Sequence, residues 1–223
     1  MVAILRQVLA PGDRDQLIHD MSRAPMLDGR QSAGQLGQNL KQNAQVDARW
    51  EHYGAMVGKV LKALGNHRQF NQHAIPRRTL PPLFSRYSVG SEYQSHVDNA
   101  FMGPFPTMRT DLSITIFLND PGDYKGGELS LETPFGTQEY KLSPGDAILY
   151  PTHYLHSVKK VTEGERLVVV TWIESLIRDP LKRDVISDLD DLMAWGVAGD
   201  IEIDALLKIE KTRLALLKMW AET

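Results

Sequence analysis

Cysteine is absent from the 223 residues, which excludes disulfide frameworks, thiolate metal sites, cysteine nucleophiles and iron–sulfur ligation. Apolar runs long enough to cross a membrane are also absent. The short apolar stretch at the start of the sequence is interrupted by Arg6, which does not fit a signal peptide. A cysteine-free chain is compatible with a reducing compartment. We therefore expect a cytoplasmic protein with no membrane partner.

A surplus of positive charge is missing as well. The sequence has 25 Lys and Arg against 28 Asp and Glu, which gives a formal net charge of −3. Proteins that bind nucleic acids or anionic membranes normally carry a basic surplus or a basic stripe. We expect no nucleic-acid partner, and the candidate substrates are small molecules, peptides or proteins.

What the sequence does contain is ordinary for a globular protein, with 42% hydrophobic and 24% charged residues. The length fits one large domain, or one domain with small attachments. The hydrophobic period changes twice along the chain. It predicts an N-terminal helical region packing on the core over 1–78, a β-rich core over 79–177 and a C-terminal helical unit over 178–223.

Two helices are predicted in the first region. Asp13 is a suitable cap for the first one. The second has apolar residues at spacings of three and four from Trp50 to Leu64, which places them on one face. Between them, residues 29–43 are rich in Gly, Gln, Asn and Ser and are predicted to form a loop.

The central region has a period of two. Residues 111–119 alternate, so that Leu112, Ile114, Ile116 and Leu118 share one side and Ser113, Thr115 and Phe117 the other. Turn signals separate further predicted strands at 83–89, 128–132, 138–142, 147–150, 157–161 and 166–173. Many short strands without intervening helices predict an antiparallel sandwich, jelly roll or barrel.

The helical period returns in the last region. Asp179-Pro180 is a helix-start pair, and a last helix is expected from about residue 201. These helices form a small unit or pack on the barrel. They are also the part of the chain that we expect to support a homodimer.

The pair His96 and Asp98 is a candidate metal site. On an extended chain the two side chains point to the same side and reach one ion together. A third ligand must come from a distant strand, for which two histidines compete. We favour His156, which opens the predicted strand 157–161, over His153, which lies nearer a loop. Two imidazoles and one carboxylate with three open positions form the facial triad of non-haem Fe(II) oxygenases.

Arg166 is a candidate anion-binding residue. Its neighbours on the same side of the predicted strand 166–173 are apolar, and burying an arginine there is costly unless an anion meets it. Its planar fork suits a bidentate carboxylate. The alternative is a strand-end arginine that reaches water, because Glu163 and Glu165 are close in sequence.

These residues resemble the iron and co-substrate ligands of the 2-oxoglutarate-dependent dioxygenases, and more closely those of the prolyl and lysyl hydroxylase-like branch. Residues 85–99, which include His96 and Asp98, resemble its first core motif. Residues 117–120 followed by 126–129 resemble its second, and 143–146 through 170–172 its third. The total length and the helical C-terminus are similar to the bacterial PKHD-type hydroxylases, a group linked to iron uptake.

The resemblance implies a double-stranded β-helix, a jelly-roll or cupin-like core with flanking helices. It implies that His96, Asp98 and His156 are the catalytic Fe(II) ligands. Arg166 would bind the distal carboxylate of 2-oxoglutarate, and Tyr87 would hydrogen-bond this co-substrate. The implied reaction consumes dioxygen and hydroxylates an unidentified substrate with release of succinate and CO2, with L-ascorbate as a further cofactor.

One position departs from the branch. Some of its prolyl hydroxylases have a tyrosine that helps to hold 2-oxoglutarate where this sequence has Phe117, which lacks a hydroxyl. Thr115 and Tyr87 are candidates to compensate.

Two further function classes stay open. A cupin-like metal-binding or iron-sensing module would share the triad but would not need Arg166. A zinc hydrolase would be active with zinc and without oxygen. Residues 29–43 and 98–109 are candidate entrance loops or plain connections. Within the first of these, Asn39, Lys41 and Asn43 are substrate contacts or surface residues.

Overall fold

Two antiparallel sheets face each other in the centre of the computed structural model, which describes residues 2–32, 34, 37–105, 107–199 and 201–222. The larger sheet has the order β1 (Ala3–Leu5), β14 (Ala147–Pro151), β10 (Leu112–Phe117), β17 (Arg166–Ser175), β6 (Leu83–Tyr87), β4 (Ala44–Val46) and β2 (Met26–Asp28), and β5 (Pro76–Thr79) also pairs with β17. The smaller sheet has the order β13 (Gly136–Tyr140), β12 (Leu129–Thr133), β15 (His156–Val158), β7 (Glu92–His96) and β3 (Lys41–Gln42). Two ribbons join β11 (Tyr124–Lys125) to β16 (Glu163–Gly164) and β8 (Phe101–Met102) to β9 (Met108–Arg109).

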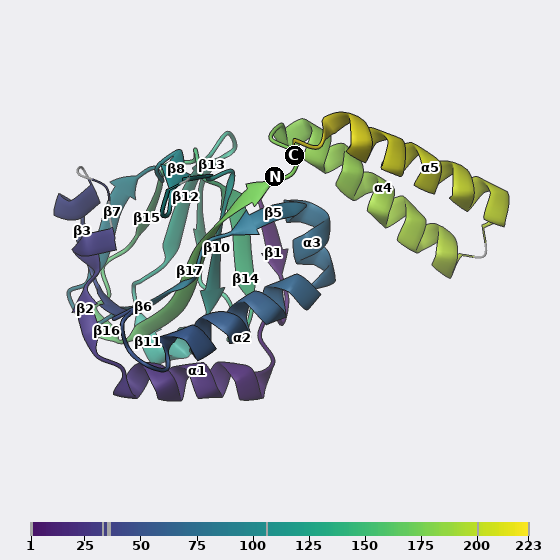
Figure 1. Ribbon diagram of the computed structural model, residues 1–223. Coiled ribbons are helices and arrows are strands. Elements are labelled where there is room, and N and C mark those ends of the chain that lie inside the picture. Colours follow the sequence, from purple (N-terminus) through teal and green to yellow (C-terminus); the bar gives the residue numbers. More distant parts are fainter. Residues whose placement is uncertain (1, 33, 35–36, 106, 200, 223) are drawn as a thin grey trace.

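Five α-helices are present among the described residues. The first three are α1 (Pro11–Arg23), α2 (Tyr53–Asn66) and α3 (Arg68–Ala74), and the C-terminal pair is α4 (Pro180–Ala198) and α5 (Ile203–Trp220). Figure 1 shows α1 and α2 against the larger sheet, whereas α4 and α5 form a hairpin that projects from the barrel. No helix among the described residues has both the length and the apolar composition that crossing a membrane requires.

The two sides of β10 face two different apolar clusters, as its alternating sequence leads us to expect. Ile114 and Ile116 are fully buried in the core cluster that includes Met56 and Val60 of α2. Phe117, on the opposite side of β10, belongs to a second cluster between the two sheets. The sandwich with flanking helices that the sequence predicts is confirmed, and its interior between the sheets is where Ser113 and Thr115 point.

The N-terminal region contains more β-structure than the helical pattern predicts. Strands β1 to β4 lie within it and extend both sheets. The expected Asp13 cap is wrong: α1 begins at Pro11, and the Asp13 carboxylate accepts a hydrogen bond from Lys59 of α2 at 2.5 Å instead. Proline suits a first helical turn because its missing N–H would have no partner there. The predicted helix start at Asp179-Pro180 is confirmed: α4 begins at Pro180, and the Asp179 side chain caps it by accepting from the Leu181 backbone N–H at 2.9 Å.

Candidate active site

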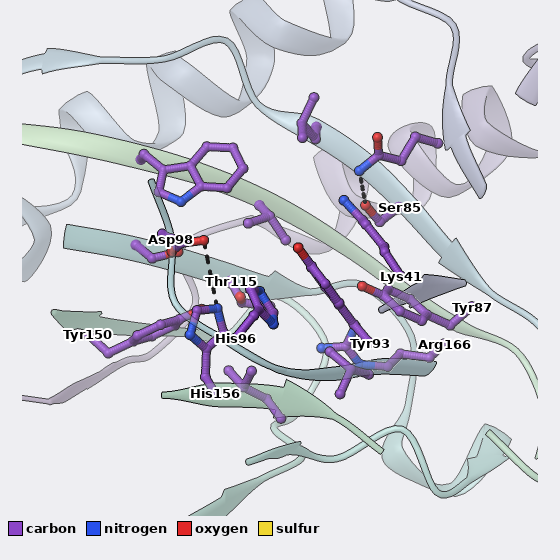
Figure 2. A pocket seen from close by; sticks show the side chains of 17 residues that line it. Lys41, Ser85, Tyr87, Tyr93, His96, Asp98, Thr115, Tyr150, His156 and Arg166 are labelled. Carbon is purple, nitrogen blue, oxygen red and sulfur yellow. Dashed lines mark hydrogen bonds and ion pairs between the residues drawn. The ribbon is translucent and has the colours of Figure 1, made fainter. Parts of the chain in front are cut away.

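Three metal-ligand side chains meet at the mouth of the cavity between the sheets. His96 ends β7 and His156 begins β15, and the two residues pair directly across these antiparallel strands. Asp98 follows β7 by two residues. One ligand atom from each of the three residues lies within 4.8 Å of the other two. Figure 2 shows Asp98 joined to His156, with Nε2 3.8 Å from Oδ1.

Backbone carbonyls fix the orientation of both imidazoles. The Nδ1 atom of His96 is 2.8 Å from the carbonyl oxygen of Gln94, and Nδ1 of His156 is 3.0 Å from that of Tyr154. A carbonyl oxygen can only accept, so Nδ1 carries the proton in each ring. In the neutral form of either ring the lone pair therefore sits on Nε2, the arrangement usual for metal-binding histidines.

The electrostatics of the cluster favour a cation. Burial, together with the neighbouring His156, lowers the pKa of His96 to about 3, which keeps this imidazole neutral. Burial raises the pKa of Asp98, and its Oδ2 has no hydrogen-bond partner among the described residues. A buried carboxylate oxygen without a partner is costly unless a positive group meets it. Two imidazole nitrogens and one carboxylate therefore fit a divalent iron ion.

Aromatic rings hold the two imidazoles in place. The Tyr93 ring stacks on His96 with centroids 3.5 Å apart and an interplanar angle of 17°. Tyr150 packs against His156 with centroids 5.3 Å apart. Trp172 also lines this part of the cavity and is largely buried. Aromatic side chains therefore pack against both imidazoles.

Arg166 opens β17 at the other end of the same cavity, as Figure 2 shows. The side chain is fully buried, with 1% exposure, and Nε has no hydrogen-bond partner within the described part of the chain. No carboxylate of the described residues forms an ion pair with it. Glu163 pairs with Lys125 at 2.7 Å, and Glu165 lies 3.7 Å from Arg86. The alternative of a solvent-exposed strand-end arginine is therefore wrong, and the buried charge of Arg166 suits an anionic ligand.

Two aromatic rings flank the guanidinium. Tyr87 pairs with Arg166 across β6 and β17, and its ring centroid is 5.0 Å from the guanidinium carbon. The ring of Phe117 is 5.4 Å from the same carbon. Phe117 thus supports the charge through its ring face, in place of the hydroxyl that a tyrosine would bring. Burial raises the pKa of Tyr87, so its hydroxyl stays protonated and able to donate.

A glycine pair lets the backbone pass close to Arg166. Gly127 has a φ of +68°, and a Cβ placed there would lie 3.0 Å from Cδ of Arg166. Gly126 has a φ of +73°, and its Cβ would lie 2.0 Å from the Lys160 carbonyl oxygen. L side chains rarely adopt this backbone region. These two glycines of the second motif therefore shape the wall around the guanidinium.

The inner cavity extends from the His–Asp cluster to Arg166. Its polar lining also includes Thr115, Tyr150 and Ser85. Thr115 thus faces the cavity, as the alternation of β10 predicts. The complete lining is Lys41, Gln45, Leu83, Ser85, Tyr87, Tyr93, His96, Asp98, Ser113, Thr115, Leu129, Tyr150, His156, Val158, Arg166, Val170 and Trp172.

An outer cavity of about 650 Å³ adjoins the inner one. The two share Lys41, Tyr93, His96, Asp98 and Trp172. Both predicted entrance segments contribute to the outer walls, which are completed by Ser32, Gly34, Gly37, Leu40, Ser95, Val97, Asn99, Met102 and Leu155. Residues 33, 35, 36 and 106 of these segments lie outside the described residues.

Of the remaining residues singled out from the sequence, one lines the cavities and the others do not take part in the site. His153 is exposed and does not join the cluster. Asn39 is exposed, and Asn43 packs against Gly29 rather than lining either cavity. Lys41 is 6% exposed and lines both cavities. Burial lowers its pKa to about 8, an effect that Asp98 opposes.

Sequence reasoning assigned no role to Tyr93. Tyr93 precedes His96 by three residues within a polar stretch that has no strand-like alternation. Its stacking on the imidazole could therefore not be predicted from the sequence. The same polarity hid β7 itself.

The chain is similar to proteins of one family. Residues 82–174 match the family described as the 2OG-Fe(II) oxygenase superfamily. A PKHD-type hydroxylase of Rippkaea orientalis is 39% identical over 225 residues, which cover 100% of both chains. The PKHD-type hydroxylase YbiX of Escherichia coli is 39% identical and covers 96% of both.

The fold is also similar to a solved structure. The crystal structure of a Pseudomonas putida prolyl-4-hydroxylase superposes with a TM-score of 0.53 at 16% identity, covering 78% of this chain and 92% of the other. At this identity the likeness concerns the fold, and it agrees with a double-stranded β-helix core.

Proposed function

The chain belongs to the PKHD-type hydroxylases of the 2OG-Fe(II) oxygenase superfamily, and we propose how its residues serve a 2-oxoglutarate-dependent hydroxylase. His96, Asp98 and His156 hold Fe(II), and Arg166 with Tyr87 binds 2-oxoglutarate. One observation carries this proposal. A single cavity contains three donors within 4.8 Å of one another and a buried guanidinium without an ion-pair partner.

The protein's part in the reaction is to hold the iron ion and to orient the molecules that react at it. When bound, Fe(II) supplies the redox chemistry that couples oxidative decarboxylation of 2-oxoglutarate by dioxygen to hydroxylation of a substrate C–H bond. The carbonyls of Gln94 and Tyr154 keep Nε2 of each histidine free to ligate. Tyr93 stacks on His96, and Trp172 lines the cavity beside the site. Because His96, Asp98 and His156 supply three donors, an iron ion held by them would keep further positions for the co-substrate and dioxygen.

Arg166 binds the distal carboxylate of 2-oxoglutarate. Its planar fork donates two parallel hydrogen bonds to such a group, and the low-dielectric surroundings strengthen them. Tyr87 adds a hydroxyl donor from the neighbouring strand. A metal-binding module without a co-substrate has no use for this buried charge, so Arg166 favours the hydroxylase over the cupin-like alternative.

The molecule to be hydroxylated binds in the outer cavity. This cavity opens directly onto His96 and Asp98, and its volume of about 650 Å³ suits a small molecule or a side chain of a peptide. The loops 29–43 and 98–109 form its entrance.

An anaerobic titration tests these assignments. Fe(II)-loaded protein is titrated with 2-oxoglutarate, and we expect a weak visible charge-transfer band followed by succinate release on admission of oxygen. A wild-type chain that gives neither band nor succinate would overturn the proposal. Activity with zinc in the absence of oxygen would favour the hydrolase instead. A requirement for L-ascorbate, a cytoplasmic location and a link to iron uptake stay predictions of the resemblance.

We further propose that two copies of the chain pair through the α4–α5 hairpin. The division into 1–78, 79–177 and 178–223 remains our working description of the chain, and the hairpin is the core of its last part. Trp195 is 68% exposed and Leu207 59% exposed. The other exposed large apolar residues of the hairpin and its connection are Leu181, Val185, Leu192, Val197, Ile201, Ile203, Leu214 and Met219.

The charges of the hairpin favour a second copy over an unrelated partner. Helix α4 carries four aspartates and two basic residues, whereas α5 carries four basic and two acidic residues. An arrangement that sets α4 of one copy against α5 of its partner is therefore complementary in charge and buries the apolar side chains. Two such hairpins together make a four-helix bundle, which buries apolar faces that a helix pair leaves open.

A further inference from the structure

We propose that Lys41 is an anion-binding residue for the primary substrate, whose carboxylate or equivalent anionic group its ammonium group receives. The inference rests on the proposed function, because the substrate binds beside the same metal site. It adds the chemical class of the substrate, which the fold and the metal ligands leave open.

Lys41 points inward from the edge of the smaller sheet. It lies on β3 and pairs with Tyr93 of β7, so its backbone is fixed next to the ring that stacks on His96. Its Nζ lies 5.2 Å from the Tyr93 ring centroid. Figure 2 shows the Lys41 side chain reaching into the pocket that holds Tyr87, Arg166 and the His–Asp cluster. An edge-strand lysine would normally extend into water.

The charge of Lys41 has no ion-pair partner among the described residues. The side chain is more than nine-tenths buried, with 6% exposure. No carboxylate of the described residues lies within 4 Å of Nζ, and its one hydrogen bond to a described side chain goes to Oγ of Ser32 at 2.8 Å. An ammonium group has three donors, and buried charges are normally paired. Two donors are therefore available to an incoming acceptor.

Ser32 orients the ammonium group before the substrate arrives. Its hydroxyl donates to the Gly29 carbonyl oxygen at 2.9 Å, which leaves the oxygen lone pairs to accept from Lys41. The lysine is thus held by the entrance loop and by β3 together. Such pre-organisation strengthens binding because little side-chain freedom is left to lose.

The position of Lys41 favours the substrate over the co-substrate as the source of the anion. Arg166 lines only the inner cavity, whereas Lys41 lines both. Asp98 is the acidic residue and Lys41 the basic residue of the outer lining. Once a metal engages Asp98, Lys41 is the charge that a molecule in the outer cavity meets. Leu40, Met102 and Leu155 supply apolar walls, so the substrate combines an apolar body with an anionic group.

A pair of matched probes tests the inference. Fe(II)-loaded protein saturated with 2-oxoglutarate and kept free of oxygen is titrated calorimetrically with hexanoate and with the neutral hexanamide. We expect the wild type to bind hexanoate about tenfold or more tightly than hexanamide. Lys41→Met should remove this preference, Lys41→Arg should keep it, and Ser32→Ala should reduce it.

The dissociation constant of 2-oxoglutarate, measured from the charge-transfer band, separates the two sources of the anion. We expect Lys41→Met to leave it within about threefold of wild type. A loss comparable to that of Arg166→Gln would assign the lysine to the co-substrate and overturn the inference. Equal binding of the two probes to the wild type, or binding of neither, would also overturn it. Failure of the proposed function would show separately, as a wild type without a charge-transfer band.

Discussion

His96 and His156 lie directly opposite one another on the antiparallel strands β7 and β15, with ring centroids 4.2 Å apart. Side chains alternate between faces along a strand, so a shift of one residue in this register turns one imidazole out of the cavity. The strand pairing is therefore as necessary to the candidate metal site as the ligands themselves.

Loss of a triad residue should abolish both metal binding and turnover. We expect His96→Ala, Asp98→Ala and His156→Ala each to weaken Fe(II) binding strongly, because each removes a direct ligand. Loss of a residue that only hydrogen-bonds to a metal ligand typically weakens metal binding by about 10- to 100-fold, and the loss here should be larger. Equilibrium dialysis with Fe(II) and succinate formation measure the two effects. His153→Ala is the control, since its ring is exposed. If His153→Ala abolished activity and His156→Ala did not, the ligand assignment would be wrong.

Arg166→Gln should weaken 2-oxoglutarate binding by about 30-fold or more, because truncating one partner of a buried charge pair costs about 2 kcal/mol or more. The charge-transfer titration gives the dissociation constant, and dialysis should show unchanged affinity for Fe(II). Arg86→Gln is the matched control on the adjacent strand, since Arg86 bonds to the Met21 carbonyl oxygen and does not line the cavity. Undiminished co-substrate binding by Arg166→Gln would refute the role of this residue.

Gly127→Ala should harm the co-substrate site as well as the fold. The positive φ alone destabilises an alanine by about 1 kcal/mol. The added Cβ would also meet the Arg166 side chain at 3.0 Å. Gly136→Ala is the control, because its φ is +101° and nothing lies within 4 Å of its Cβ. We expect both variants to lower the melting temperature and only Gly127→Ala to raise the dissociation constant of 2-oxoglutarate. If both variants raised the dissociation constant of 2-oxoglutarate equally, the proposed effect of Gly127 on Arg166 would be wrong.

Charges placed on the hairpin should separate the proposed dimer. Trp195→Asp combined with Leu207→Asp replaces two exposed apolar side chains and should leave the monomer folded. Light scattering coupled to size exclusion should give twice the chain mass for the wild type and the chain mass for the variant. Val89→Asp, at an exposed apolar position on the barrel, is the control that stays dimeric. A monomeric wild type at micromolar concentration would refute the pairing.

Acid should loosen the attachment of α4 through His73. Its Nδ1 lies 2.9 Å from Oγ of Ser187 on α4, and burial lowers the pKa of this imidazole below the usual 6.5, although Asp191 and Asp184 oppose the shift. The unfolded chain therefore binds a proton first as the pH falls, so this contribution to stability is present above 6.5 and lost below it.

Melting temperatures at about pH 7.5 and about pH 5.5 measure the effect of His73. The fall on acidification should be smaller in His73→Asn than in wild type, because asparagine does not titrate. His153→Asn, at an exposed position, should behave as wild type. An identical fall in the wild type and His73→Asn would contradict the prediction.

The parts of the fold that follow a regular period were predictable. The alternation in β10 and the apolar side of β17 place Thr115 and Arg166 in the cavity from the sequence alone. Strands β1 to β4 were missed because segments of two or three residues carry no period. Strand β7 was missed because its side chains are polar on both faces.

Lys41 shows why part of the site could not be predicted. It occurs in a loop-like stretch rich in Gly, Gln and Asn, where lysines are normally solvated. Its burial results from β3 pairing with β7, a tertiary contact between residues remote in sequence. Asn43, equally polar and two residues away, instead fills space beside Gly29.

The two imidazoles take their proton acceptors from the main chain, at residues 94 and 154. Exchanging a side chain does not remove a main-chain carbonyl, so mutation cannot easily switch the tautomer of either ring. Substitutions at positions 94 and 154 should therefore leave the tautomer of each ring unchanged. The orientation that leaves Nε2 free is thus set by the path of the main chain beside β7 and β15 and not by a neighbouring side chain.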